Sequence, residues 1–358
     1  MGLLMIWILR RPKINRLALN LLLVFLLTQA LSLIGADNAG AGLVRLEQYL
    51  LAGLLGVYIA STKRELLSAK LYAPLIFAVL FESILAILQF LKGGTLVFWI
   101  LGERGFTITT PGIAKFDFYG VQFLRPYATF PHPNVLAAFM LVGALLLLGG
   151  IKGNKVYKGL CVVLGALTVL LTVSRTAIVA GGISALFLLK KKGRLLLLAG
   201  VLLLLPILYT RFAAVFNFDN LTLTRREELS GVAWQIFLTS PILGAGLNNF
   251  IPAVSDQLLT GPSRFLQPVH NIFLLALAET GVLGLLGLLG LLGYPIFMLF
   301  KLFPKPYPLN PILLIWAVII FLGLFDHYFL TLPQGYRLLF LVWGISFSML
   351  EWKNAKPS

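Results

Sequence analysis

The chain has 358 residues, of which 59% are hydrophobic and only 12% are charged. About a quarter of the residues of a soluble globular domain are charged, so this composition excludes that class and indicates a polytopic membrane protein. The formal net charge of +16 would suit nucleic acid, but the lysines gather in short links between apolar runs, and we expect no nucleic-acid partner.

Ten apolar runs are candidates for helices that cross a bilayer. A hydrocarbon core about 30 Å thick needs roughly 20 helical residues. The sequence therefore predicts an all-α transmembrane bundle that forms a single integral membrane domain over residues 1–358. The predicted spans are residues 17–34, 43–60, 71–91, 134–150, 159–173, 176–189, 195–209, 271–299, 311–330 and 334–350.

The lysines of the short links indicate how the spans are oriented. They are Lys13, Lys63, Lys70, Lys152, Lys155, Lys158, Lys190, Lys191, Lys192, Lys301, Lys305, Lys353 and Lys356. If the spans alternate, all these links fall on one side, which the positive-inside rule identifies as the cytoplasm, together with both termini. Two long outer loops remain, at residues 92–133 and 210–270. We expect the chemistry there, because long loops in compact membrane proteins usually carry function.

Arginine, unlike lysine, is the main basic residue of the predicted outer side. Its planar fork binds phosphate bidentately and stays charged when partly buried. Arg45, Arg175 and Arg337 fall in or beside the first turn of outward-facing helices, and Arg125 precedes another. An anion is favoured at a helix N-terminus and a cation is not. These arginines predict a shared anionic ligand in the outer mouth of the bundle; surface ion pairs are the alternative for any one of them.

The first outer loop ends on the stretch FLRPYATFPHPN, residues Phe123–Asn134. Pro131 and Pro133 fix the backbone at the start of the fourth span, since proline suits the first helical turn. His132 and Asn134 are candidate substrate-binding residues. The alternative is a rigid helix start in which Asn134 is a polar cap.

The stretch TVSRTA, residues Thr172–Ala177, forms a tight outer turn between two spans. Ser174 is a candidate N-cap. Arg175 has almost no loop on which to reach water, so we expect it to point into the bundle mouth.

The second outer loop contains a predicted amphipathic helix over about residues 225–240. Thr224 and Glu227 have capping-box spacing, which predicts a start at Arg225. An apolar stripe at helical spacing follows and indicates a helix on the outer membrane surface: Leu229, Val232, Ala233, Ile236 and Phe237. Arg225 and Arg226 would occupy the first turn of this helix, where a bound anion is stabilised. A scaffold helix with a solvated charge cluster is the alternative.

The stretch QPVHNIFLLALAETG opens the eighth span with His270 and Asn271, and Asn271 is a candidate substrate-binding residue. Membrane helices exclude ionisable groups unless these have a use. Glu279 lies nine residues further on, about 180° around the helix, so it must meet another segment, and a buried structural role is favoured. Gly284, Gly287, Gly290 and Gly293 then form a seam for close helix packing.

Asp326 and His327 lie near the outer end of the ninth span. Neighbours in sequence do not face each other on a helix, so the sequence does not decide whether this pair has a functional or a structural role. The three histidines lack zinc spacing, and no divalent-metal or ATP-binding pattern occurs. We therefore expect no cofactor and no metal.

These stretches together resemble the O-antigen ligase and polymerase family of bacterial membrane glycosyltransferases. The family typically shows an arginine before Gly-Thr-Phe-x-His-Pro-Asn, where this chain has Arg125 and then Ala128–Asn134 with alanine in place of glycine. The family's Ser-Arg turn is matched by Ser174–Arg175. Its arginine-led outer helix before Pro-x-x-Gly-x-Gly is matched by Arg226 and Pro241–Gly246, and its His-Asn followed by Glu-x-Gly by His270–Asn271 and Glu279–Gly281.

The resemblance implies a donor glycan carried on a polyprenyl diphosphate and an acceptor hydroxyl on a lipid, glycan or protein. Arg125, Arg175 and Arg226 would hold the diphosphate, and His270 would orient or deprotonate the acceptor. His132 and His327 would matter less. A transporter or flippase for the same lipid-linked glycan is the alternative, although it should carry polar groups through the full depth of the bundle.

The predicted topology is testable by labelling engineered cysteines with an impermeant reagent from outside. Sites near Lys115 and Arg264 should react, whereas sites near Lys155 and Lys191 should react only after the membrane is opened. Labelling after the membrane is opened is the control that shows each engineered cysteine can react. Labelling of the cysteine near Lys155 from outside would overturn the topology.

Overall fold

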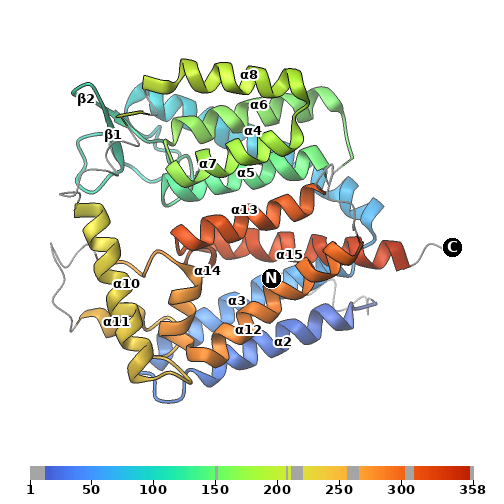
Figure 1. The fold of residues 1–358 in the computed structure, drawn as a ribbon, viewed down its shortest axis with the longest axis vertical. Coiled ribbons are helices and arrows are strands. Elements are labelled where there is room, and N and C mark those ends of the chain that lie inside the picture. Colours follow the sequence, from blue (N-terminus) through green and yellow to red (C-terminus); the bar gives the residue numbers. More distant parts are fainter. Residues whose placement is uncertain are drawn as a thin grey trace. The chain divides into compact units, whose positions relative to one another are not determined.

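The computed structural model describes residues 13–149, 152–206, 209–210, 221–255, 266–302 and 310–354. The described chain is mostly helical (Figure 1). It divides into a first unit, from Met1–Leu67, Leu221–Pro304 and Gly323–Ser358, and a second, from Ser68–Asn220 and Lys305–Leu322. Of the basic residues named above, Lys305, Lys356 and Arg264 lie outside the described residues.

Each unit is assembled from segments that are distant in sequence. The first unit holds α2 (Arg16–Leu31), α3 (Ala39–Ala60), α10 (Leu221–Thr239), α11 (Phe250–Ser255), α12 (Ile272–Leu302), α14 (Tyr328–Thr331) and α15 (Pro333–Asn354). The second holds α4 (Arg64–Lys92), the 3-10 turn η1 (Trp99–Leu101), β1 (Lys115–Phe118), β2 (Val121–Leu124), α5 (Pro133–Gly149), α6 (Lys155–Leu171), α7 (Arg175–Leu188), α8 (Lys191–Leu203) and α13 (Pro311–Phe325). The start of α4 and the end of α13 belong to the first unit.

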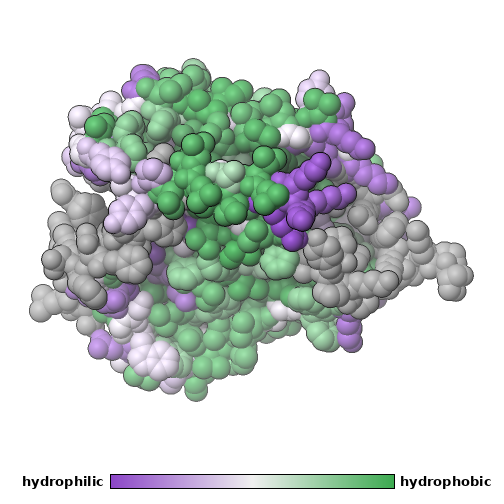
Figure 2. Space-filling view, turned by 45° about the horizontal axis from the view of Figure 1, so that its top comes forward, coloured by the Kyte–Doolittle hydropathy of each residue, from purple (hydrophilic) through white to green (hydrophobic). Residues whose placement is uncertain are grey.

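The helices are those of an integral membrane protein. Among the described residues, Ala39–Ala60, Leu66–Lys92 and Ile272–Leu302 are long and apolar enough to cross a membrane, and α2, α5, α7 and α13 are apolar but shorter. Each predicted span overlaps a helix. Apolar side chains cover much of the visible surface (Figure 2), as expected where lipid replaces water.

The predicted span at residues 311–330 is interrupted. Helix α13 ends at Phe325, and α14 begins at Tyr328. The backbone N–H of His327 donates to its neighbour's carboxylate, Asp326 Oδ1, at 2.9 Å. Such a local side-chain acceptor competes with the helical bond and favours a break. The prediction of one continuous helix over residues 311–330 is therefore wrong at this break.

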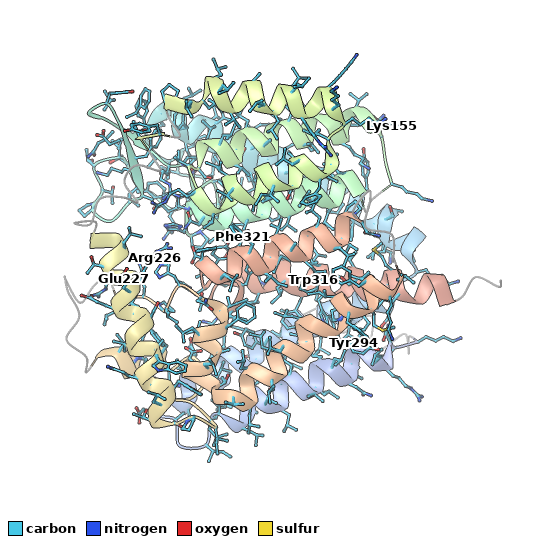
Figure 3. The ribbon with its side chains drawn as sticks, viewed as in Figure 1. Lys155, Arg226, Glu227, Tyr294, Trp316 and Phe321 are labelled. Carbon is cyan, nitrogen blue, oxygen red and sulfur yellow. The ribbon has the colours of Figure 1, made fainter. Side chains whose placement is uncertain are left out.

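The loop at residues 92–133, predicted to lie outside, contains a hairpin that the all-helical prediction missed. β1 pairs antiparallel with β2, from Lys115↔Leu124 to Phe118↔Val121. The turn is Tyr119–Gly120, where both residues have positive φ and Asp117 Oδ1 accepts the Gly120 N–H. A two-residue turn ending in glycine is a known hairpin signal. Within the second unit, the hairpin and Lys155 at the start of α6 lie at opposite ends of the helices (Figures 1 and 3).

Helix α10 begins earlier than predicted. It starts at Leu221, so Thr224 does not cap it, and Arg225 and Arg226 lie in its second turn. The predicted apolar stripe faces protein, since Leu229, Val232, Ala233 and Ile236 are buried and α10 packs on α12. Arg225 pairs with Glu228 at 3.6 Å, which fits the charge cluster kept as the alternative.

Small residues allow close helix packing in the first unit. A side chain on Gly344 of α15 would collide with the backbone of Gly56 on α3. In the predicted seam of α12, a side chain on Gly287 would collide with Thr28 of α2, whereas nothing lies within 4 Å of Gly290 or Gly293. The seam is therefore a helix contact over its first half only.

Helix α12 is kinked at Gly281, which has φ 61° and ψ −164°. The loop Pro241–Gly246 pairs with the backbone groups that the kink releases. The N–H groups of Ala245 and Gly246 donate to the carbonyls of Ala278 and Glu279, at 2.9 and 2.8 Å, and the Val282 N–H donates to the Pro241 carbonyl at 2.9 Å. We call this pairing of Pro241–Gly246 with Ala278–Leu283 the kink joint.

Glycine is required on both sides of the kink joint. A side chain on Gly281 would collide with Ile242, and one on Gly244, which has φ 69°, would collide with Glu279. The Pro-x-x-Gly-x-Gly and Glu-x-Gly stretches are therefore the two halves of one contact.

Gly281→Ala should destabilise the protein by more than about 1–3 kcal/mol, the typical strain of such a backbone conformation, because the new methyl group also collides with Ile242. Thermal unfolding in detergent measures this. Gly290→Ala is the matched control, since that glycine lies on the same helix with open space around it. Equal melting temperatures for the two variants would contradict the joint.

Candidate functional site

Three titratable side chains from separate segments meet in the first unit. His270 comes two residues before α12, and Asp326 and His327 form the break between α13 and α14. Their metal-ligating atoms all lie within 4.8 Å of one another. The sequence does not indicate that the Asp326–His327 pair joins His270, because the segments are far apart in the chain. We call these three residues the histidine cluster.

The two imidazole rings of the cluster pack edge to face, with centroids 5.3 Å apart. His327 Nδ1 lies 2.6 Å from the hydroxyl oxygen of Thr331, which itself donates to the His327 carbonyl at 3.2 Å. We infer that Nδ1 carries the proton and donates to this hydroxyl, because the hydroxyl hydrogen is already used. His327 Nε2 then carries a lone pair, 4.0 Å from Asp326 Oδ1.

The surroundings of the cluster are positively charged. Arg226 reaches from α10 and donates to the Phe325 carbonyl at 3.3 Å (Figure 3). The charges of Asp326, Arg226 and Arg45 all act on the His327 ring. Within the described residues Arg226 Nε is buried without a hydrogen-bond acceptor, a donor that suits an anionic oxygen.

Arg45 has a structural role. It lies in the second turn of α3, further from the N-terminus than expected. Its guanidinium donates to the Leu330 and Thr331 carbonyls at 3.2 and 2.6 Å, and to Asn248 Oδ1 at 3.2 Å. It therefore binds the carbonyl end of α14, where a cation is favoured. Arg337 also lies in a second turn, on α15, and is exposed.

Asn271 and Glu279 hold the segments around His270. Asn271 Oδ1 accepts the N–H groups of Phe273 and Leu274 at 2.9 and 3.0 Å, so this residue, predicted to bind substrate, is the N-cap of α12. Glu279 meets another segment, as expected. Its carboxylate accepts the Asn248 and Phe250 N–H groups at 3.0 and 3.2 Å, beside the kink joint.

In the second unit, Arg125 connects two helix ends. Its buried guanidinium donates to the Thr172 carbonyl at 2.6 Å and to Asn134 Oδ1 at 2.7 Å, joining the end of α6 to the start of α5. Arg175 is the first residue of α7, as predicted, and Ser174 occupies the N-cap position without a side-chain cap bond. Arg125 and Arg175 thus flank one short turn.

The start of α5 is rigid, but His132 rather than Asn134 caps it. Pro133 is the first helical residue, and the Asn134 N–H donates to His132 Nδ1 at 3.1 Å. The oxygen of Asn134 remains engaged with Arg125. The helix cap and the contact with Arg125 therefore come from two residues of one motif, His132 and Asn134.

Polar residues of α4 hold the preceding Tyr127–Thr129 segment, a role that sequence reasoning missed. Gln89 Oε1 accepts the Tyr127 and Ala128 N–H groups at 2.9 and 2.8 Å. Glu82 accepts from the Thr129 N–H at 3.1 Å and from its hydroxyl. Ala128 has φ 48°, a left-handed conformation that favours the glycine typical of this motif.

Comparison with known families agrees with these motifs. Residues 160–289 match the family described as O-antigen ligase, and no curated protein matches the chain. The matched range includes Arg175, Arg226 and His270 but not Arg125 or the Asp326–His327 pair. The match confirms the resemblance seen in the sequence and supports an O-antigen ligase or polymerase type of membrane glycosyltransferase.

The histidine cluster has the residue types of a metal site, yet we expect it to bind no divalent cation, because Arg45 and Arg226 both act on it. Purified protein dialysed against Zn²⁺ or Mn²⁺ should retain no stoichiometric metal by elemental analysis. The Asp326→Asn variant should give the same metal content. One metal per chain in the wild type, lost in that variant, would contradict the expectation.

Proposed function

Since residues 160–289 of this chain belong to the O-antigen ligase family, we propose that it is a membrane glycosyltransferase acting on a polyprenyl-diphosphate-linked glycan. It transfers the glycan, or joins repeat units, onto an acceptor hydroxyl of a lipid, glycan or protein. The observation that carries the proposal is the histidine cluster in its positively charged surroundings. Transfer from a diphosphate needs a neutral base together with cationic groups.

On the donor side, arginines bind the diphosphate. Arg226 is the best-supported contact, because its buried Nε lacks an acceptor among the described residues. The family motifs assign Arg125 and Arg175 to the diphosphate as well, and we propose Arg225, His132 and Asn134 as further donor contacts. As the sugar–oxygen bond breaks, negative charge grows on the leaving diphosphate, and guanidinium donors stabilise it in the transition state.

On the acceptor side, His270 is the general base. The acceptor hydroxyl oxygen attacks the anomeric carbon, and the bond from that carbon to the diphosphate oxygen breaks. The hydroxyl proton moves to the imidazole of His270, and the diphosphate leaves with the bonding electron pair. Direct displacement inverts the anomeric carbon and requires neither a metal nor a nucleotide.

Asp326 and His327 are positioning residues in this scheme. The Asp326 carboxylate, which has an oxygen within 4.8 Å of a His270 ring nitrogen, stabilises the imidazolium that forms on His270. His327 packs against His270 and holds its ring. This role is larger than the minor one that the sequence suggested for His327.

The reaction site faces the outside of the cytoplasmic membrane, in the proposed topology of ten spans with both termini inside. The separation of the hairpin from Lys155 within the second unit supports this arrangement. A transporter for the same lipid-linked glycan would bind the donor without needing an acceptor base.

Arg226→Ala, Arg175→Ala and Arg125→Ala should each weaken binding of the lipid diphosphate tenfold or more. A hydrogen bond to a charged group contributes about 1.5–3 kcal/mol. Replacing the same arginines with lysine should restore little of this binding where the contact depends on the planar guanidinium fork. Binding of a polyprenyl diphosphate to purified protein measures the effect. Thermal unfolding of each variant is measured as well, because Arg125 also joins two helix ends and its loss could destabilise the protein. Arg337→Ala, an exposed arginine, is the matched control. Normal binding by all three alanine variants would refute the arginine assignment.

His270→Ala should bind donor normally yet transfer glycan 10²–10⁴-fold more slowly, the loss typical of acid–base catalysis. Single-turnover transfer at saturating donor and acceptor measures this. His132→Ala, which alters a helix cap, should keep substantial activity. His327→Gln should lose less activity than His270→Ala. Near wild-type transfer by a folded His270→Ala variant would remove His270 from the mechanism. Donor binding without transfer to any acceptor in the wild type would favour the transporter.

A further inference from the structure

The first outer loop carries a continuous run of exposed apolar side chains. Val97, Phe98, Trp99, Ile100 and Leu101 are exposed by 55%, 49%, 73%, 78% and 55%. We call these residues the apolar tip. Single exposed hydrophobic residues are ordinary, whereas a contiguous group marks an interaction site.

The apolar tip is held in place by buried polar groups. Glu103, only 2% exposed, accepts the Leu96 and Phe98 N–H groups through its two oxygens, each at 2.7 Å. Between them Val97 has φ 66°, a conformation that a β-branched residue adopts only under constraint. The exposure of the tip is therefore a defined conformation of the loop.

The same contacts fix the tip to the end of a candidate membrane span. Gln89 of α4 donates to Glu103 Oε1 at 2.7 Å, and Lys92 Nζ donates to the Thr95 carbonyl at 2.8 Å. Gln89 lies three residues before the last residue of α4, about 4.5 Å along the helix. The tip is therefore attached at the depth where α4 leaves the hydrocarbon region.

We propose that the apolar tip inserts into the bilayer leaflet that the C-terminal end of α4 reaches. Tryptophan and other aromatic residues favour this interface. The tip contains no charge and is flanked by Lys92 and the exposed Arg104, which complement anionic headgroups. Leu91, the residue before the last of α4, is also 74% exposed. The proposal rests on α4 crossing the membrane and is independent of glycan transfer.

Depth measurement with a nitroxide spin label tests the insertion. Ile100→Cys, in a Cys161→Ala background, is labelled and reconstituted into phosphatidylethanolamine and phosphatidylglycerol vesicles. Collision rates with oxygen, which concentrates in lipid, and with a water-soluble nickel chelate are compared. Leu91→Cys on α4 is the lipid reference, and Thr109→Cys, exposed in the same loop, is the water reference.

The oxygen-to-nickel ratio at position 100 should approach that at Leu91 and exceed that at Thr109 several-fold. A ratio equal to that at Thr109 would overturn the proposal, because the tip would then lie in water. Low collision rates with both reagents would also overturn it, by showing that protein, such as a second copy of the chain, covers the tip. If Ile100→Cys does not fold, Trp99→Cys gives the same measurement.

Discussion

The kink joint is the constraint on which the first unit depends. A helix that breaks inside an apolar environment releases carbonyl and N–H groups that neither lipid nor a hydrophobic core can satisfy. Here Pro241–Gly246 supplies partners for the groups released around Gly281. The loop can approach so closely only because glycine occupies both sides of the contact. Glu279 extends the joint by accepting the two N–H groups at the start of α11.

This joint determines how the candidate site is supported. It connects the C-terminal end of α10 to α12, and the apolar stripe of α10 packs on the same helix. Arg226 is carried by α10, and His270 immediately precedes α12. The two side chains that we propose as phosphate-binding and acid–base groups in this unit therefore stand on elements held together by backbone hydrogen bonds. Such support provides the preorganisation that an acid–base group and a phosphate-binding group need.

The arginines of the outer segments have different roles, although they share a residue type. Arg45 holds the carbonyl end of α14, and Arg125 joins helix ends through a carbonyl and an amide oxygen. Arg226 has a donor without an acceptor among the described residues. Guanidinium groups suit both roles because they remain charged when buried and offer several donors in one plane. A guanidinium group that makes a structural contact through one edge can still bind a ligand through its other edge.

The sequence by itself determined the class of protein, the helical segments, the start of α5 at Pro133 and of α7 at Arg175, and the motifs of the O-antigen ligase family. These follow from apolar length, proline geometry and local spacing, which act within a few residues. Only the tertiary structure decided that Asp326 and His327 join His270 and that two glycine motifs form one joint. Contacts between segments far apart in the chain depend on how helices pack, and no local pattern encodes them. The break after Phe325 and the start of α10 also escaped prediction, because a single side chain or cap decides where a helix ends.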